Sequence, residues 1–150
     1  MSNNESSRLT KVRIETPSKE DRYQLNKETV WAIPLGKQLY RLDNVPFYPF
    51  DLSLHDIVRC RESDDDMPVV TELIQASGCK TLRVMFCEET SEENCVDIIW
   101  ELRRQGIDNE KFYFKCYGFV VEPNQDYEAV RNYLQIKEEE GYLWIYESDE

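Results

Sequence analysis

The sequence is poor in glycine and histidine, and these two scarcities argue against several kinds of site. Of 150 residues, five are glycine and only His55 is histidine. No glycine-rich loop is present that could bring backbone amides around a phosphate, so P-loop or Rossmann nucleotide binding is not expected. The five cysteines include no Cys-x-x-Cys pair, which argues against a zinc site of clustered thiolates and imidazoles. We expect no metal and no cofactor.

The chain also lacks a run of basic residues and a long apolar run. Thirty acidic residues outnumber eighteen basic ones, and the net charge of −12 would repel a nucleic-acid backbone. No apolar stretch approaches the ~20 residues that a membrane-spanning helix needs. Residues 1–15 lack the apolar core of a signal peptide. We therefore expect a cytoplasmic protein with free thiols and with neither a nucleic-acid nor a membrane partner.

What the chain does have is enough apolar and aromatic material to fold. Hydrophobic residues make up 41% of it and aromatic residues 12%, a composition typical of globular proteins. The acidic excess has two interpretations. It keeps the protein soluble, or it accelerates the encounter with a basic protein partner.

Short strand-like runs dominate the first half of the chain. Residues 11–16 alternate between apolar and polar side chains, as a half-buried strand does. Four further runs follow at 29–35, 38–42, 56–60 and 68–74. The first two of these are separated only by a short break around Gly36, which predicts a β-hairpin. Short strands with no helical pattern between them favour a small barrel or a strongly curled sheet.

The pattern changes after Gly78. Residues 81–86 alternate as a strand, and Thr90-Ser91-Glu92-Glu93 forms a capping box that predicts a helix to about Gln105. Further patterns predict strands at 112–116 and 119–122 around a turn at 117–118, a helix at 127–140 and a strand at 142–146. The order strand-helix-strand-strand-helix-strand is that of a ferredoxin-like sandwich.

These patterns divide the chain into three parts. Residues 1–26 form an N-terminal arm with one candidate strand, residues 27–78 a small β-rich subdomain, and residues 79–150 a ferredoxin-like α+β subdomain. The predicted fold class is therefore α+β, with a small β-barrel-like sheet followed by a ferredoxin-like βαββαβ unit.

The stretch YRLDNVPFYPF, residues 40–50, is the most unusual in the sequence. Asp43 and Asn44 have side chains that hydrogen-bond nearby backbone amides in turns, and aromatic residues are more often core than recognition material. A structural corner is the first interpretation. The alternative is a binding surface in which Tyr48 is exposed and Asp43 is free to meet a ligand. His55 and Asp56 follow closely and complete this candidate ligand or corner site.

The runs WAIPLGKQLYRLDNVPFY, SLHDIV and SGCKTLRVMF resemble a bacterial family known as domain of unknown function 4265. The resemblance extends from about Thr29 to Tyr146. It implies a bacterial protein with this two-part layout, and it supplies no catalytic residue. One departure is visible, because His55 stands where the family pattern leads us to expect glycine. If that glycine serves a tight turn, the turn here must tolerate a side chain.

The sequence offers little for catalysis. His55 lies beside Asp56, but adjacent residues of a strand point to opposite faces, and nearby Ser53 belongs to no nucleophile elbow. Cys95 falls on the apolar face of the first predicted helix and is expected in the core. We assign no catalytic residue and expect that the protein is not an enzyme.

Two functions fit these observations. The first is a non-catalytic, acidic protein-binding module, such as an immunity or inhibitor protein that binds a basic toxin or regulator. Its candidate contacts are acidic residues in two groups, Asp64, Asp65 and Asp66, then Glu88, Glu89, Glu92 and Glu93, together with Glu138, Glu139 and Glu140 at the end of the second predicted helix. The alternative is a small-molecule-binding regulatory or sensor domain, by analogy with other ferredoxin-like units. The sequence defines no oligomeric state.

Overall fold

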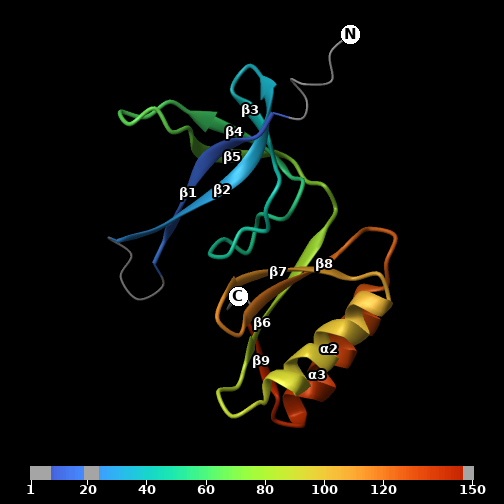
Figure 1. The fold of residues 1–150 in the computed structure, drawn as a ribbon. Helices are drawn as coiled ribbons and strands as arrows, with labels where there is room; N and C mark the ends of the chain where they lie inside the picture. Colours follow the sequence, from blue (N-terminus) through green and yellow to red (C-terminus); the bar gives the residue numbers. More distant parts are fainter. Residues whose placement is uncertain (1–7, 19–23, 147–150) are drawn as a thin grey trace. The chain divides into compact units, whose positions relative to one another are not determined.

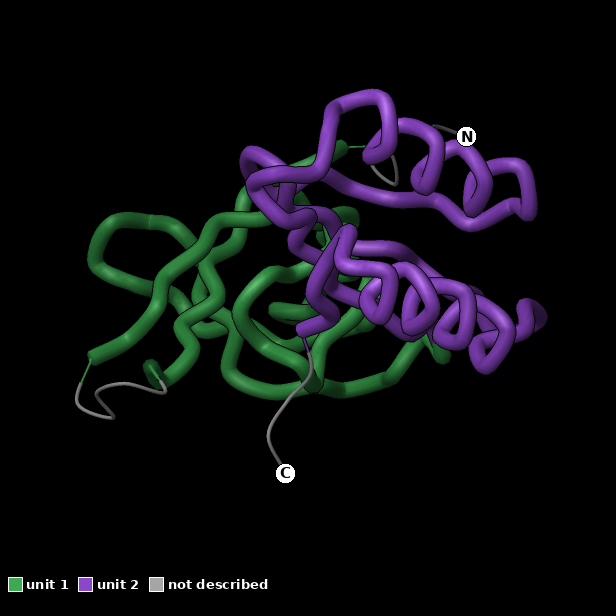
Figure 2. Tube along the Cα trace, turned by 90° about the horizontal axis from the view of Figure 1, so that it is seen from below, with its two compact units in different colours: residues 1–78 green, residues 79–150 purple. Residues whose placement is uncertain are grey.

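The computed structural model describes residues 8–18 and 24–146. The chain divides into two compact units, residues 1–78 and 79–150 (Figure 2). Within the predicted N-terminal arm, residues 1–7 and 19–23 lie outside the described residues.

The first unit is a closed five-stranded barrel (Figure 1). Its strands are β1 (Thr10–Pro17), β2 (Leu25–Gly36), β3 (Leu39–Leu42), β4 (Ile57–Arg61) and β5 (Val69–Gln75). Each strand is antiparallel to the next, and a parallel pairing of β1 with β5 closes the barrel. The α+β class and the N-terminal barrel are therefore confirmed.

The strand β1 is a full member of this barrel. It pairs with β2 along its whole length, from Thr10 opposite Ala32 to Pro17 opposite Leu25. The candidate strand of the arm therefore lies in the same sheet as residues 27–78. The alternating side chains of β1 point inward as its pattern predicts, and they join a core of Val12, Ile14, Val30, Ala32, Leu42, Leu52, Val58 and Cys60.

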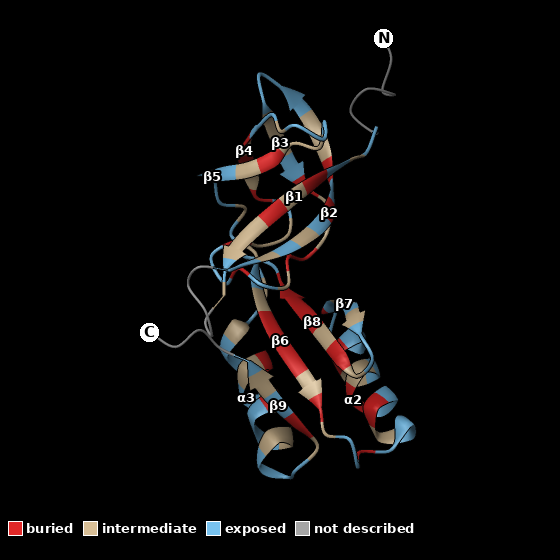
Figure 3. Ribbon diagram, turned by 90° about the vertical axis from the view of Figure 1, so that its left-hand side faces the viewer, coloured by how far each residue is buried: buried red, intermediate tan, exposed pale blue. Residues whose placement is uncertain are grey.

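The second unit is a four-stranded sheet with two helices. Its elements are β6 (Lys80–Phe86), α2 (Glu92–Arg104), β7 (Asp108–Tyr113), β8 (Cys116–Val121), α3 (Tyr127–Glu139) and β9 (Leu143–Tyr146). The strand order is β7-β8-β6-β9, and every neighbouring pair is antiparallel. Both helices lie on the same side of the sheet (Figures 1 and 3).

The core of this unit lies between the sheet and the two helices. Its buried side chains follow the helical stripe of α2 and alternate along β6 and β8, which Figure 3 shows in red. They are Leu82, Val84, Phe86, Cys95, Ile98, Leu102, Ile107, Phe119, Val121, Val130, Leu134 and Leu143. The expected burial of Cys95 is confirmed.

The start of α2 differs from the predicted capping box by one residue. The N-cap is Ser91, whose hydroxyl accepts a hydrogen bond from the amide of Asn94 at 3.1 Å. Thr90 is instead buried, and its hydroxyl donates to the carbonyl of Tyr142 at 2.7 Å. Because the Thr90 side chain is engaged in this tertiary hydrogen bond, the next hydroxyl along the chain caps the helix.

The turn between β7 and β8 lies at Phe114-Lys115, so the predicted turn at residues 117–118 is wrong. Gly118 is inside β8, between Arg83 of β6 and Glu110 of β7. The turn instead uses Lys115 at a φ of +63°. This left-handed conformation normally favours glycine.

Candidate binding groove on the second unit

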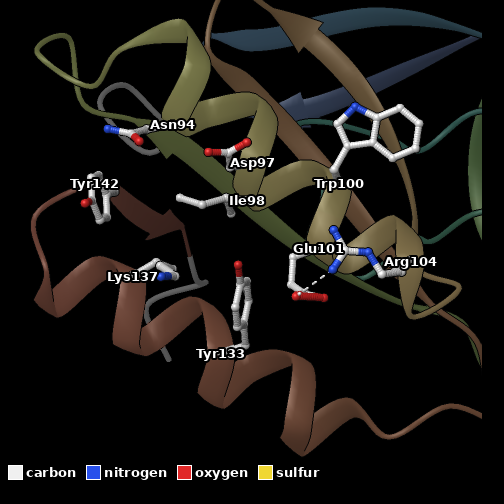
Figure 4. Close-up of a pocket in the computed structure, with 9 residues that line it drawn as sticks. All are labelled: Asn94, Asp97, Ile98, Trp100, Glu101, Arg104, Tyr133, Lys137 and Tyr142. Carbon is white, nitrogen blue, oxygen red and sulfur yellow. Dashed lines mark hydrogen bonds and ion pairs between the residues drawn. The ribbon is translucent and has the colours of Figure 1, made fainter.

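A groove of about 440 Å³ lies between α2 and α3 (Figure 4). Polar and aromatic side chains line most of it, and all of them belong to the second unit. They are Asn94, Asp97, Ile98, Trp100, Glu101, Arg104, Tyr133, Lys137 and Tyr142.

The wall from α2 follows from helical spacing. Asn94, Asp97 or Ile98, and Glu101 recur every three or four residues and so share one face of the helix. Ile98 is buried and belongs to the core, whereas the other three present polar groups to the groove. Trp100 lies at the same end of the groove as Glu101 and Arg104 (Figure 4). It is 57% exposed, which is unusual for so large an apolar side chain.

The wall from α3 holds a cation between aromatic rings. The Lys137 ammonium lies 5.5 Å from the ring centre of Tyr133 and 5.8 Å from that of Tyr142. It also pairs with a Glu140 carboxylate oxygen at 3.1 Å, and this hydrogen bond raises the pKa of Lys137. Burial raises the pKa of the Tyr133 phenol, whose hydroxyl points into the groove (Figure 4). Both groups therefore keep their protons at neutral pH.

An exposed acidic segment precedes α2 and forms its first turn. Glu88 and Glu89 lie in the loop between β6 and α2, and Glu92 and Glu93 lie in the first turn of α2. All four side chains are exposed. Residues 87–102 contain six acidic residues and no basic one, so α2 is negatively charged along the approach to the groove.

Lys115 holds the loop that carries this acidic segment. Its ammonium donates hydrogen bonds to three backbone carbonyls, those of Cys87 at 3.1 Å, Glu88 at 2.8 Å and Thr90 at 2.6 Å. These contacts explain why a lysine occupies the left-handed turn between β7 and β8, since the strained backbone is offset by charged hydrogen bonds.

The other predicted acidic group, Asp64, Asp65 and Asp66, lies on the first unit in the exposed loop between β4 and β5. Asp65 is engaged there, since it accepts hydrogen bonds from the Ser63 hydroxyl and the Arg13 guanidinium. These contacts hold the pKa of Asp65 well below its usual range.

At the YRLDNVPFYPF corner the polar side chains bind backbone. The side-chain oxygen of Asn44 accepts from the amide of Trp31 at 2.7 Å, and the amide of Asp43 donates to the Trp31 carbonyl at 2.8 Å. The carboxylate of Glu28 on β2 accepts from the amides of Phe47 at 2.9 Å and Tyr48 at 3.1 Å. Tyr48 is exposed. These bonds show a corner built on β2, and no local pattern in the sequence indicates the part that Glu28 has in it.

Asp56 binds backbone amides, and His55 lies in a turn. Asp56 is only 3% exposed, and its two carboxylate oxygens accept from the amides of Ser53 and Ser77, both at 2.8 Å. His55 is exposed at a φ of +70°. Its turn thus has the left-handed backbone that glycine would favour, as the departure from the family pattern implied.

A second cavity, of about 330 Å³, lies on the other side of α2 and is more apolar. It is lined by residues of α2 and of the β7–β8 hairpin: Glu92, Cys95, Val96, Ile99, Lys111, Phe114, Lys115 and Tyr117. Phe114, at the hairpin tip, is among the most exposed apolar residues of the unit.

The five cysteines all lie within the described residues, and none of them forms a disulfide bond there. Among residues 8–18 and 24–146, no three His, Cys, Asp or Glu side chains gather in a way that could hold a metal ion. Over the same ranges, no helix has the length and apolar character needed to cross a bilayer.

The fold and the groove define an α+β protein with a small barrel, a two-helix sandwich and a polar, aromatic surface site. The model of the family described as Domain of unknown function (DUF4265) matches residues 28–145. The chain belongs to this family, and the resemblance noted from its sequence is confirmed.

Similarity to a solved structure supports the fold alone. A solved structure titled "Novel crystal structure of a hypothetical protein from Neisseria gonorrhoeae" is similar to this chain, with a TM-score of 0.78 and 18% sequence identity. The match covers 93% of this chain and 94% of that one. No curated protein matches the chain.

Proposed function

We propose that this protein is a non-catalytic binding module that recognises a basic protein partner through the α2–α3 face of its second unit. An example of such a module is an immunity or inhibitor protein that binds a basic toxin or regulator. The observation that carries the proposal is Trp100, which is largely exposed beside a groove and lies within residues 87–102, a stretch with six acidic residues and no basic one.

This face has the features of a protein-binding surface. Tryptophan, tyrosine and arginine dominate the binding energy of interfaces, and the groove contains Trp100, Tyr133, Tyr142 and Arg104. The acidic segment around it would accelerate the encounter with a cationic partner and would make that encounter sensitive to salt.

The non-catalytic part of the proposal is supported by the candidate chemical groups. The Asp56 carboxylate is buried and accepts two backbone amides, so it is poorly placed to orient His55 for proton transfer. Burial raises the pKa of the thiols of Cys60, Cys95 and Cys116, which makes them weaker nucleophiles. Five cysteines that form no disulfide bond among the described residues also support a reducing compartment such as the cytoplasm.

We also infer that the second unit belongs to the ferredoxin-like class. The order β-α-β-β-α-β, the antiparallel sheet β7-β8-β6-β9 and the two helices on one side support this assignment.

Affinity purification from the native host tests the proposed function. The tagged protein is expected to retain a basic protein at low ionic strength and to release it as the salt concentration rises. Glu93→Lys should weaken retention, whereas the matched charge reversal Asp64→Lys, on the first unit, should not. Absence of any basic partner at low salt, or equal effects of the two reversals, would contradict the proposal.

The second cavity favours an alternative, a small-molecule-binding regulatory domain. Its volume, about 330 Å³, lies within the range of ligand pockets, and its apolar lining carries two lysines and one glutamate. This alternative predicts a metabolite fraction that raises the melting temperature of the wild type but not that of a Phe114→Ala variant. A flat response across a broad metabolite extract would count against it.

A further inference from the structure

The charged groups of the α2–α3 groove divide into paired and unpaired ones. Arg104 pairs with Glu101 at 3.3 Å, and Lys137 pairs with Glu140 at 3.1 Å. Both cations of the groove are therefore paired with a carboxylate on their own helix or at its end. The side chain of Asp97 makes no hydrogen bond or ion pair within the described part of the chain. The uncompensated charge of the groove is negative and lies on Asp97.

The acidic neighbours of Asp97 along α2 increase the attraction of this position for a cation. Glu93 and Glu101 lie four residues before and four residues after it, on the same helix face. Like charges at this spacing repel one another, and Glu101 is only partly neutralised because its ion pair with Arg104 is exposed. A cation bound at Asp97 would relieve this repulsion on both sides.

The aromatic rings of the groove already attract cations. Lys137 lies over Tyr133 and Tyr142, and the guanidinium of Arg103 lies 5.9 Å from the ring centre of Trp100. The last distance is close to the ~6 Å limit of an effective cation–π contact, so Arg103 holds the indole loosely. Most of the Trp100 ring remains exposed to a further planar group.

We propose that this groove receives an arginine side chain of the basic partner, an inference that rests on the proposed function. A guanidinium can give Asp97 two parallel hydrogen bonds and can stack its flat face on an aromatic ring, and an ammonium can do neither. Tyr133 and Asn94, two further groove residues, offer oxygen atoms to its remaining N–H groups. The groove thereby selects arginine over lysine.

An NMR titration with acetyl-arginine-amide tests this inference without the partner. The probe should shift the indole N–H signal of Trp100, assigned with a Trp100→Phe variant, in a saturable manner. Acetyl-lysine-amide should bind several-fold more weakly. The uncharged acetyl-citrulline-amide, which keeps the shape of arginine, should leave the signal unmoved. Equal binding of the arginine and lysine probes would overturn the arginine assignment, as would no saturable shift.

Asp97→Asn provides the matched variant, because it keeps the size of the side chain and removes its charge. It should weaken the arginine probe about tenfold, as expected when a charge-assisted hydrogen bond is lost. Asp108→Asn, on β7 and outside the groove lining, should leave probe binding unchanged. If Asp97→Asn binds like the wild type, the inference is wrong.

The two proposals can fail separately. A partner that is lost with Trp100→Ala but bound equally well by Asp97→Asn would leave the proposed function intact and overturn the arginine site. Saturable arginine binding by a protein that retains no basic partner at low salt would support the site and contradict the proposed function.

Discussion

The two units of this protein use their polar side chains in opposite ways. In the barrel, Glu28, Asn44 and Asp56 accept hydrogen bonds from backbone amides and fix a corner that has little regular structure. In the groove of the second unit, the side chains of Asp97 and the exposed Trp100 form no hydrogen bond with backbone groups of the described residues. The polar side chains of YRLDNVPFYPF therefore serve the architecture of the barrel, whereas the inconspicuous surface of α2 carries the groups that we propose bind a partner.

The largest expected effect separates two aspartates. Asp56→Ala removes a buried acceptor of two amides and should destabilise the barrel by about 3 kcal/mol, whereas Asp97→Ala should change the stability of its unit by less than about 0.5 kcal/mol. Urea unfolding, followed by the fluorescence of Trp31 for the barrel and of Trp144 for the second unit, measures both. Each tryptophan is read with the other two replaced by phenylalanine. Similar losses at the two positions would break the comparison.

Lys115 is a residue of the second unit whose polar side chain, like those of the barrel corner, hydrogen-bonds backbone groups. Lys115→Ala loses the bonds to three carbonyls and leaves alanine at a positive φ, so it should destabilise the unit by about 2 kcal/mol. Lys115→Gly relieves the backbone strain and should therefore be less harmful, though still less stable than the wild type. Urea unfolding of the two variants is the measurement. If the glycine variant matches the wild type, the lysine bonds contribute nothing.

The barrel core should also carry a pH dependence at high pH. Burial raises the pKa of Cys60 from 9.0 to about 12. Between these two values the unfolded chain loses the thiol proton while the folded barrel keeps it, so barrel stability should fall as pH rises from 9 to 12. Below pH 9 the thiol contributes no slope. The Cys60→Ala barrel should have a lower free energy of unfolding at every pH but should lack this decrease between pH 9 and 12. Identical slopes of unfolding free energy against pH in the two proteins would contradict the prediction.

The smallest effect concerns the left-handed turn before Asp56. His55→Gly should stabilise the barrel by less than about 1 kcal/mol, because glycine adopts a φ of +70° without strain. The gain is limited by the greater entropy of glycine in the unfolded chain. A loss of stability in thermal unfolding would show instead that the His55 imidazole makes a stabilising contact.

The sequence was informative wherever local chemistry decides the structure. The alternation of Val12 and Ile14 predicted β1, and Gly106 and Gly141 end the two helices at positive φ. It was misleading where a tertiary contact decides. Thr90 does not cap α2, because its hydroxyl donates a hydrogen bond to the carbonyl of Tyr142. Lys115 occupies a turn position that favours glycine because its ammonium binds backbone carbonyls 25 to 28 residues away.

The groove was missed for a similar reason. Its walls come from α2 and α3, and no local pattern reveals that their outer faces meet around a cavity. Tyr133 and Lys137 share the helical spacing of the buried Val130 and Leu134, which indicates a core-facing side of the helix. One signal was present, however. Trp100 lies off the apolar stripe of Cys95, Ile98 and Leu102, and a tryptophan at such a position of an amphipathic helix indicates a binding surface.

The central claim is that the α2–α3 face is the binding surface, and two equally exposed tryptophans test it most directly. Trp100 is 57% exposed in the groove, and Trp144 is 64% exposed on β9. The affinity of Trp100→Ala and Trp144→Ala for the partner purified at low salt should be measured beside the wild type. The account predicts an about 30-fold loss with Trp100→Ala, as for an interface hot spot, and wild-type affinity with Trp144→Ala. Undiminished binding by Trp100→Ala would contradict it.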